Sequence, residues 1–388
     1  MGLCEEASVI RVGFGATVWA ACTRAGHLDG IGVYTKALWC ELQQLAETEH
    51  EALVLKPYAF GRDFPIMECG SPVALGREFA PHALSLSLFG KSFGLSSLYK
   101  EIDVFHATDH YIPLVPSVPV VATVMDVIPF LHPEWTSRRF RNLKNFLFEK
   151  SIRSAQHIIT ISEYSKSAIV NLFDIDPASI SVTPLGVDQV YFSRALPEVK
   201  AAVLLKYSLS ADFFLFVGTL QPRKNLQRVI SAFKALPREI RAVHRLVVVG
   251  RDGWGSDDVL FELQALERSG EAVWLKYLPR AEVLALLQSA AALVFPSLYE
   301  GFGLPVLEAF ASQCPVITSN TTSLPEVAGD SAWLVDPLSV DEISHAMLNI
   351  LSRDEITQAR IISGYERALS FSWKSCAFST LQVYRNLR

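Results

Sequence analysis

The sequence lacks a marked excess of charge of either sign. Its 35 Lys and Arg residues are nearly balanced by 40 Asp and Glu residues, which leaves a formal net charge of -5 over 388 residues. Proteins that bind nucleic acid hold the phosphate backbone through clustered positive charge. We therefore expect no nucleic acid among the partners of this chain.

Cysteine pairs with metal-ligand spacing are also missing. The six cysteines are scattered along the chain, and no two of them form a Cys-x-x-Cys pair. This spacing favours free, mostly buried thiols in a reducing compartment over a disulfide framework or a zinc site. We therefore expect no metal ion and no cofactor.

Long apolar runs are absent as well. The longest, such as 290–295, are far shorter than the roughly 20 residues that a transmembrane helix requires. The segment 1–7 contains Glu5 and Glu6, whereas a secretory signal begins with basic residues and continues into a longer apolar stretch. The sequence therefore predicts a cytoplasmic protein that does not span a membrane.

What the chain does have is a regular alternation of apolar, strand-like runs with segments of helical periodicity. This order predicts the α/β class, with parallel strands joined by crossover helices, and the length is sufficient for two domains. Around 185–200 the pattern loosens into polar, Pro-containing sequence. We place the boundary there, with domains at 1–195 and 196–371. The expected strands are 9–14, 52–55, 104–106, 118–124, 157–161, 181–183, 213–217, 245–249, 273–277, 292–295, 316–318 and 332–335.

The segment 295–308 combines a glycine loop with two acidic residues. It ends an expected strand and opens a helix near Leu304, where the first helical amides and those of 301–303 carry the positive end of the helix dipole. Such a terminus favours an anion such as a phosphate. Glu300 and Glu308 could accept hydrogen bonds from hydroxyls on two parts of one ligand, such as a sugar nucleotide. The alternative is that Glu308 is solvated on the helix face and Glu300 only favours the dipole.

A second polar loop follows the first strand of the second domain. Arg223 and Lys224 lie between this strand and an amphipathic helix. Two cations beside a helix N-terminus can stabilise the charge that develops on a departing nucleoside diphosphate without a metal ion. The alternative is that the pair is an exposed helix cap.

The spacing of Glu300 and Glu308, separated by seven residues, resembles the paired-glutamate signature of retaining glycosyltransferases of family 4. This resemblance implies the GT-B fold, in which two Rossmann-like doubly wound domains face a central cleft, with a C-terminal helix, here 372–388, completing the first domain. Three further segments are similar to the same family: Ser319–Asp330, Leu334–Pro337 and 365–373.

The resemblance also assigns roles to residues. It implies that Glu300 and the backbone after it hold the donor sugar and that Glu308 holds the ribose. The implied donor-binding residues besides Glu308 are Gly301, Phe302, Gly303, Leu304, Gly218 and Thr219. Many family members carry Arg where this chain has Thr219. The loop resembles a mannosyltransferase-like branch that reads Gly-Thr-x-x-Pro-Arg-Lys-Asn, which is the reason to favour GDP-mannose over another nucleotide sugar such as UDP-glucose or UDP-N-acetylglucosamine.

In the first domain, candidate residues follow three expected strands. Gly30, Ile31 and Gly32 resemble the family's glycine loop that faces the diphosphate and the acceptor, although such glycines are also common in turns. Asp126 is positioned to orient an acceptor hydroxyl or to end a strand. The preceding Met125 replaces the family's usual His, and a thioether cannot donate a hydrogen bond or shuttle a proton. Two further candidates for the acceptor side, with structural roles as the alternative, are His106 and Asp109.

The stretch 135–153 is rich in Lys and Arg with interleaved aromatic and aliphatic residues. It predicts either peripheral contact with the inner face of a membrane or an ordinary surface helix. The resulting prediction is a metal-independent, retaining transfer of a hexose to a saccharide or lipid-linked acceptor. The alternatives are a GT-B sugar-nucleotide epimerase and, because of Met125, a catalytically weak nucleotide-binding protein.

Overall fold

The computed structural model describes residues 9–48, 52–89, 100–113, 115, 117–136 and 140–387. The chain divides into two compact units. The first unit comprises Met1–Gly186 together with Trp373–Arg388, and the second comprises Val187–Ser372. Each unit has its own parallel sheet and its own hydrophobic core.

Within the described residues, the first unit contains a seven-stranded parallel sheet in the order β3-β2-β1-β4-β5-β6-β7. The strands are buried and rich in Val, Ile and Phe because helices cover both faces of the sheet. Strand β3 has no counterpart among the expected strands. The strands are β1 (Ile10–Gly15), β2 (Leu53–Phe60), β3 (Val73–Gly76), β4 (Val104–Ala107), β5 (Val120–Thr123), β6 (His157–Thr160) and β7 (Ile180–Val182).

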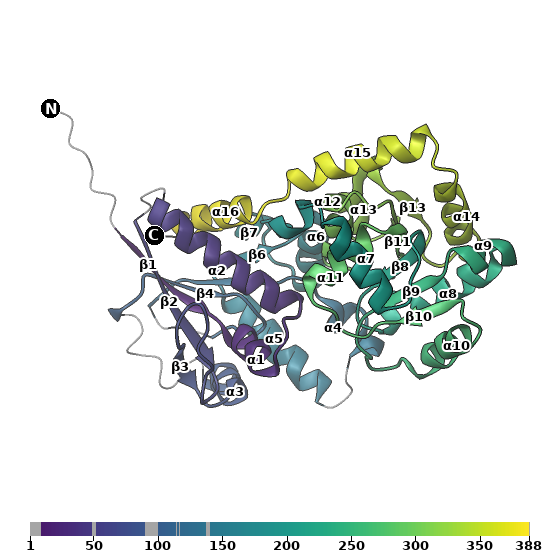
Figure 1. Ribbon diagram of the computed structural model, residues 1–388. Helices are drawn as coiled ribbons and strands as arrows, with labels where there is room; N and C mark the ends of the chain where they lie inside the picture. Colours follow the sequence, from purple (N-terminus) through teal and green to yellow (C-terminus); the bar gives the residue numbers. More distant parts are fainter. Residues whose placement is uncertain are drawn as a thin grey trace. The chain divides into compact units, whose positions relative to one another are not determined.

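The helices of the first unit follow the strands as in a doubly wound fold. Helix α2 buries Leu38, Leu42 and Leu45, which recur at helical spacing, and it packs beside the C-terminal helix α16, as Figure 1 shows for the purple and yellow segments. The helices are α1 (Thr17–Ala25), α2 (Gly30–Thr48), α3 (Phe79–Phe89), α4 (Ile128–Leu131), α5 (Arg141–Ser154), α6 (Glu163–Phe173) and α16 (Trp373–Asn386).

The second unit contains a six-stranded parallel sheet in the order β10-β9-β8-β11-β12-β13, counted over its described residues. Its helices cover both faces of this sheet, so this unit is also doubly wound, and the α/β prediction is confirmed. The strands are β8 (Phe213–Val217), β9 (Leu246–Val249), β10 (Ala272–Trp274), β11 (Ala290–Phe295), β12 (Val316–Ser319) and β13 (Trp333–Val335). The helices are α7 (Pro197–Lys206), α8 (Leu226–Ala235), α9 (Arg238–Val243), α10 (Asp257–Arg268), α11 (Arg280–Leu287), α12 (Leu304–Ala311), α13 (Leu324–Ala328), α14 (Val340–Leu351) and α15 (Glu355–Leu369).

The first boundary between the units lies nine residues before the expected position. The segment 187–195 belongs to the second unit because its polar groups are bound there: Asp188 pairs with Arg280 at 2.5 Å, and the Ala195 amide donates to Gln288 at 3.0 Å. The loose sequence pattern located the region of the linker, but these side-chain contacts decide which unit the segment 187–195 belongs to.

None of the helices in the described ranges is long and apolar enough to cross a lipid bilayer.

Candidate active site

Three loops meet at the carboxyl ends of β8, β9 and β11 in the second unit. The Leu298 amide donates to the Arg223 carbonyl oxygen at 2.7 Å, which joins the loops after β8 and β11. The loop after β9 comes so close that a Cβ atom on Gly250 would lie 1.8 Å from the Gly218 carbonyl oxygen. Gly250 also has φ 156, so glycine is required at this approach. The three loops therefore share one edge of the sheet.

Glu300 lies between the two predicted cations. Its carboxylate accepts a hydrogen bond from Lys224 Nζ at 2.6 Å and from Arg223 Nη1 at 3.1 Å, and the residue is 7% exposed. Burial alone raises the pKa of Glu300, but the charges of Lys224 and Arg223 outweigh it and hold the pKa below its ordinary value. Glu300 is therefore an ionised acceptor of hydrogen bonds at neutral pH.

Asn225 holds the cationic loop in place. It has φ 63 and is 2% exposed, and its side-chain amide donates to the carbonyl oxygens of Pro296 and Pro337 at 2.8 and 2.7 Å. Asn tolerates this left-handed conformation better than most residues. The side chain thus ties the start of α8 to the loops that follow β11 and β13.

The glycine loop before α12 is fixed from behind by Ser323. Its hydroxyl donates to the Glu300 and Phe302 carbonyl oxygens at 2.9 and 2.8 Å. Gly303 has φ 123, and a Cβ atom there would lie 2.7 Å from Leu324. The loop backbone and the α12 N-terminus are thereby held at the edge of the sheet, where the helix dipole favours an anion.

Glu308, in the second turn of α12, contacts a different set of residues from Glu300. The Tyr191 hydroxyl donates a hydrogen bond to it, and Arg280, which pairs with Asp188, lies close enough to exert a Coulombic effect. Although part of its surface remains accessible, burial raises the pKa of Glu308 to about 7, and Arg280 and Tyr191 only partly oppose this rise. Glu308 therefore changes protonation near neutral pH.

The remaining predicted donor residues lie in or next to these loops. Gly218 contacts the aliphatic chain of Lys224, whose atoms lie 3.8–3.9 Å from an ideal Cβ position on that glycine. The Phe302 side chain, in contrast, is buried edge-to-face against Phe371 with ring centroids 5.8 Å apart. Only the backbone of Phe302 is available to a ligand, as is consistent with the predicted role of the loop amides.

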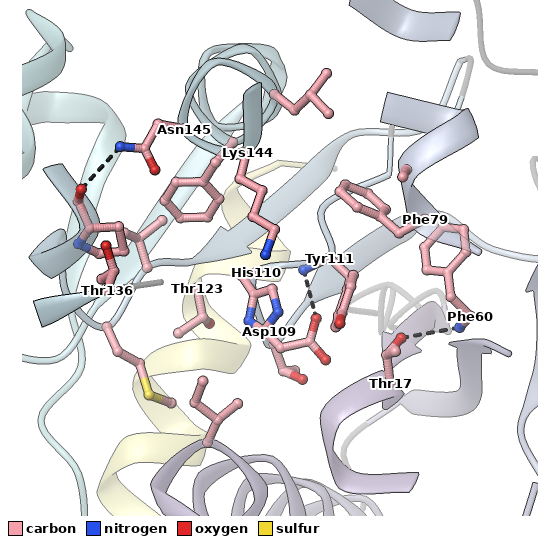
Figure 2. Close-up of a pocket in the computed structure, with 18 of the residues that line it drawn as sticks. Thr17, Phe60, Phe79, Asp109, His110, Tyr111, Thr123, Thr136, Lys144 and Asn145 are labelled. Atoms are coloured by element: carbon pink, nitrogen blue, oxygen red, sulfur yellow. Dashed lines mark hydrogen bonds between the residues drawn. The ribbon is translucent and has the colours of Figure 1, made fainter. Parts of the chain in front are cut away.

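The first unit contains a pocket of about 790 Å³ at the carboxyl ends of its central strands, shown in Figure 2. Thr17 follows β1, Asp109 follows β4 and Asp126 follows β5, so the pocket includes the switch point between β1 and β4, where ligands of doubly wound sheets bind. Of the residues predicted to face the acceptor, Ile31, Asp109 and Asp126 line this pocket, and Met125 lines it beside them.

His106 does not face the pocket, so its assignment to the acceptor side is wrong. It is fully buried, with Nδ1 bonded to the Tyr384 hydroxyl at 2.5 Å and Nε2 to the Thr123 hydroxyl at 2.8 Å. Burial lowers the pKa of His106 to about 3, so the ring is neutral. The ring joins β4 to α16 in the core, and its partner Tyr384 lies 278 residues away in the sequence.

The other predicted residues of the first unit are held by hydrogen bonds that involve backbone amides. Asp109 accepts hydrogen bonds from the amides of Val18 and Tyr111 at 3.0 and 2.9 Å, and Asp126 accepts one from the Ile128 amide at 3.1 Å. The glycines Gly30 and Gly32 belong to the first turn of α2, where the Gly32 amide donates to Asp29 at 2.8 Å. Asp109 and the two glycines thus have the structural roles that the sequence left open.

The basic stretch 135–153 is α5 and the turn before it, except that 137–139 lie outside the described residues. Leu147 and Ile152 are buried, whereas Phe140, Leu143 and Phe146 are 65%, 49% and 47% exposed. Arg141, Lys144 and Asn145 of α5 line the pocket of the first unit. Sequence reasoning missed this contribution.

Sequence reasoning also missed Tyr191 and Arg280, because nothing in the chain marks residues 117 and 28 positions before Glu308 as its neighbours. Asn225 and Ser323 lie inside segments that carry the family resemblance, so the motif contained a signal for them. In the described part of the chain, no three His, Cys, Asp or Glu side chains gather in a way that could bind a metal ion.

Comparison with known proteins decides the family. Residues 28–190 match the family described as Glycosyltransferase Family 4, and residues 208–367 match Glycosyl transferases group 1. The O-antigen chain mannosyltransferase B of Escherichia coli is 37% identical over 294 residues, which are 74% of this chain and 75% of that protein. The chain belongs to glycosyltransferase family 4.

Two further similarities fit this family 4 enzyme. The serotype-specific mannosyltransferase WbdA of Escherichia coli is 26% identical over 282 residues, and the match covers 69% of this chain but only 33% of that protein. The sucrose-phosphate synthase of Thermosynechococcus elongatus superposes with a TM-score of 0.71 at 17% identity, covering 97% of this chain and 99% of that one. The fold is GT-B, and the protein is a hexosyltransferase, which confirms the family and the reaction class predicted from the paired glutamates.

Proposed function

We propose that this enzyme transfers mannose from GDP-mannose to a hydroxyl of a saccharide or lipid-linked saccharide, with retention of configuration and without a divalent metal. The observation that carries the proposal is the buried cluster of Glu300 with Arg223 and Lys224 beside the N-terminus of α12. The choice of mannose is supported by the relatives that are named mannosyltransferases.

In this proposal the donor binds to the loops of the second unit. The loop amides and the dipole of α12 receive the diphosphate, while Glu300 accepts hydrogen bonds from sugar hydroxyls. Arg223 and Lys224 supply the charge that a metal ion would otherwise provide. They neutralise the negative charge that develops on the departing GDP.

The transfer step exchanges one bond at the anomeric carbon for another. The bond from the anomeric carbon to the GDP oxygen breaks, and the acceptor oxygen bonds to the same carbon from the same face. The acceptor hydroxyl proton passes to the departing phosphate oxygen. In this scheme Asp126, which lines the pocket of the first unit, orients the acceptor hydroxyl.

Glu308 holds the donor by its ribose. Two ribose hydroxyls donate to its carboxylate, while Tyr191 and Arg280 fix the side chain from the protein side. Because ribose is common to all nucleotide sugars, this contact gives affinity but does not select the base.

The donor is tested by thermal-shift titration of the full chain with GDP-mannose, UDP-glucose, UDP-N-acetylglucosamine and the free diphosphates. We expect GDP compounds to stabilise the protein, by about 2.7 kcal/mol at a concentration 100 times the Kd. Stabilisation by UDP compounds alone would mean that the choice of GDP-mannose is wrong.

Metal independence and stereochemistry need separate measurements. A chelator should leave the transfer rate unchanged, and a rate that falls and returns with magnesium would contradict the proposal. Proton NMR of the first-formed product should show the anomeric configuration of the donor.

We also propose that the protein works on the cytoplasmic side of a membrane, in contact with anionic lipid through Leu143, Phe146 and Lys150 of α5. The apolar side chains are half exposed and stand beside basic ones, as suits an anionic surface. The described cysteines are free, which fits a reducing compartment. Replacing Leu143 and Phe146 by Asn should reduce cosedimentation with vesicles rich in anionic lipid, and unchanged cosedimentation would refute the contact.

A further inference from the structure

Three basic side chains line the pocket of the first unit without an ion-pair partner among the described residues: Arg77, Arg141 and Lys144. Arg141 donates to the Pro133 carbonyl oxygen at 3.0 Å. After the hydrogen bonds that the Glu134 carboxylate accepts, the charge of Arg141 also helps to lower the pKa of Glu134, but Glu134 is paired with His132. Arg77 and Lys144 are exposed and Arg141 is half-buried, so the charges of these cations are open to an anionic ligand.

The pocket is also lined by three acids, Glu78, Asp109 and Asp126. Asp109 is buried and accepts two backbone amides, Asp126 accepts the amide of Ile128, and Glu78 is exposed next to Arg77 in the chain. Figure 2 shows the Lys144 side chain extending from its helix toward His110 and Asp109, with its amine inside the cavity. Two of the three carboxylates are engaged by backbone amides, whereas the three cations have no ion-pair partner among the described residues, so the pocket favours an anionic group on a ligand.

The opposite wall of the pocket is aromatic. Phe79 packs edge-to-face against Tyr111 with ring centroids 5.4 Å apart and against Phe60 at 5.3 Å, and Figure 2 shows these rings together on one side of the cavity. Aromatic rings of this kind suit the apolar C–H face of a sugar ring. A volume of about 790 Å³ is sufficient for a sugar together with a charged substituent.

We propose that this pocket binds an acceptor saccharide that carries a phosphate group, with the sugar against Phe79 and Tyr111 and the phosphate on Lys144, Arg141 and Arg77. The inference rests on the proposed function and deepens it, because it names the class of acceptor that the enzyme uses. Arg pairs with phosphate through two parallel N–H donors and Lys through a compact charge, so this set of side chains matches a phosphate dianion or a diphosphate.

The test separates this pocket from the donor loops, which also bind phosphate groups. The full chain is first titrated with GDP, which examines the proposed function by itself. The GDP-saturated protein is then titrated with inorganic pyrophosphate and with undecyl phosphate below its micelle concentration, and binding is followed by calorimetry. If no nucleotide binds, the proposed function fails, and the same titration is made on the free protein, with Lys224→Met removing any binding at the donor loops.

The matched variants are Lys144→Met and Lys100→Met, which remove the same charge from the first unit inside and outside the pocket. We expect Lys144→Met to weaken binding of both probes at least about tenfold, because one charge-assisted hydrogen bond is lost, while Lys100→Met leaves it unchanged. Tighter binding of undecyl phosphate than of pyrophosphate identifies a lipid-linked phosphate, and the reverse identifies a soluble glycosyl phosphate. No saturable binding by the GDP-saturated protein, or equal effects of the two variants, would overturn the inference.

Discussion

Glu300 and Glu308 have the same side chain but lie in opposite electrostatic environments within one segment. Two cations lie within hydrogen-bond distance of Glu300 and keep its pKa low, whereas Glu308 is desolvated with weaker compensation, so that its pKa is raised to about 7. The first residue is suited to remain ionised throughout transfer, and the second is suited to bind ribose only when it is deprotonated.

Replacement of Glu300 by Gln tests its role in transfer. The amide removes the negative charge but keeps the size, so we expect kcat to fall about 100-fold with little change in the Kd for GDP. Steady-state kinetics and calorimetry measure the two quantities. The matched variant Glu271→Gln removes a carboxylate that also pairs with an arginine, Arg241, but outside the loop cluster, and it should leave kcat unchanged. Equal effects of both variants would reduce Glu300 to a structural acid.

The raised pKa of Glu308 predicts that nucleotide binding depends on pH. Below about pH 7 the carboxyl is protonated and accepts ribose hydroxyls poorly, so the Kd for GDP should rise as the pH falls from 8 to 6. In Glu308→Gln this dependence should be absent and binding should be weak at every pH. A wild-type Kd that stays constant across this range would contradict the assignment.

The same shift predicts that Glu308 destabilises the folded protein at high pH. Its folded pKa lies above the ordinary 4.5, so the folded state binds the proton more tightly, and its contribution to stability is lost as the pH rises through about 7. Glu308→Gln should therefore raise the free energy of unfolding at pH 8 by about 2 kcal/mol, allowing for partial exposure, and leave it nearly unchanged at pH 4.5. Urea denaturation at both pH values measures the difference.

At the scale of elements, the donor site depends on how the loops at one sheet edge are tied together. The strand order places the carboxyl ends of β8, β9 and β11 side by side, and Asn225 and Ser323 connect the loops through buried hydrogen bonds to backbone carbonyl oxygens. A small number of residues that cannot contact the substrate through their side chains thus position those that can.

Replacement of Asn225 measures this connection. Asn225→Ala leaves two buried carbonyl oxygens without their donor and strains a backbone at φ 63, so we expect a loss of about 3 kcal/mol in unfolding free energy. Asn225→Gly loses the same hydrogen bonds but relieves the strain, and it should be more stable than the Ala variant by about 1 kcal/mol. Chemical denaturation compares the three proteins, and a neutral Ala variant would show that the loops need no such connection.

At the scale of the whole molecule, the two units have separate cores, and the C-terminal helix returns to the first of them. Helix α16 contributes Tyr384, whose hydroxyl is bonded to the buried His106 of β4. The chain therefore passes between the units twice, after Gly186 and after Ser372.

Tyr384→Phe tests whether this return stabilises the first unit alone. Removal of the hydroxyl leaves a buried ring nitrogen unsatisfied, and we expect the free energy of unfolding of the first unit to fall by about 1–3 kcal/mol with an unchanged Kd for GDP. The control is Tyr365→Phe in the second unit, a partly exposed residue, which should change stability by less than about 0.5 kcal/mol. Calorimetric unfolding with and without GDP separates the two cores, and a weaker Kd for GDP in Tyr384→Phe would contradict their independence.

By itself the sequence determined the α/β class, the two-domain organisation, the family, and the choice of Arg223, Lys224 and Glu300 as candidate site residues. These features are local: they depend on periodicity, on loops that follow strands, and on motifs of about ten residues. Only the tertiary structure decided that His106 is a core residue, that 187–195 belongs to the second unit, and that Tyr191 and Arg280 surround Glu308. It also placed Arg77 and Lys144 in one pocket. Protonation and accessibility depend on neighbours that are remote in the chain, and no local pattern encodes them.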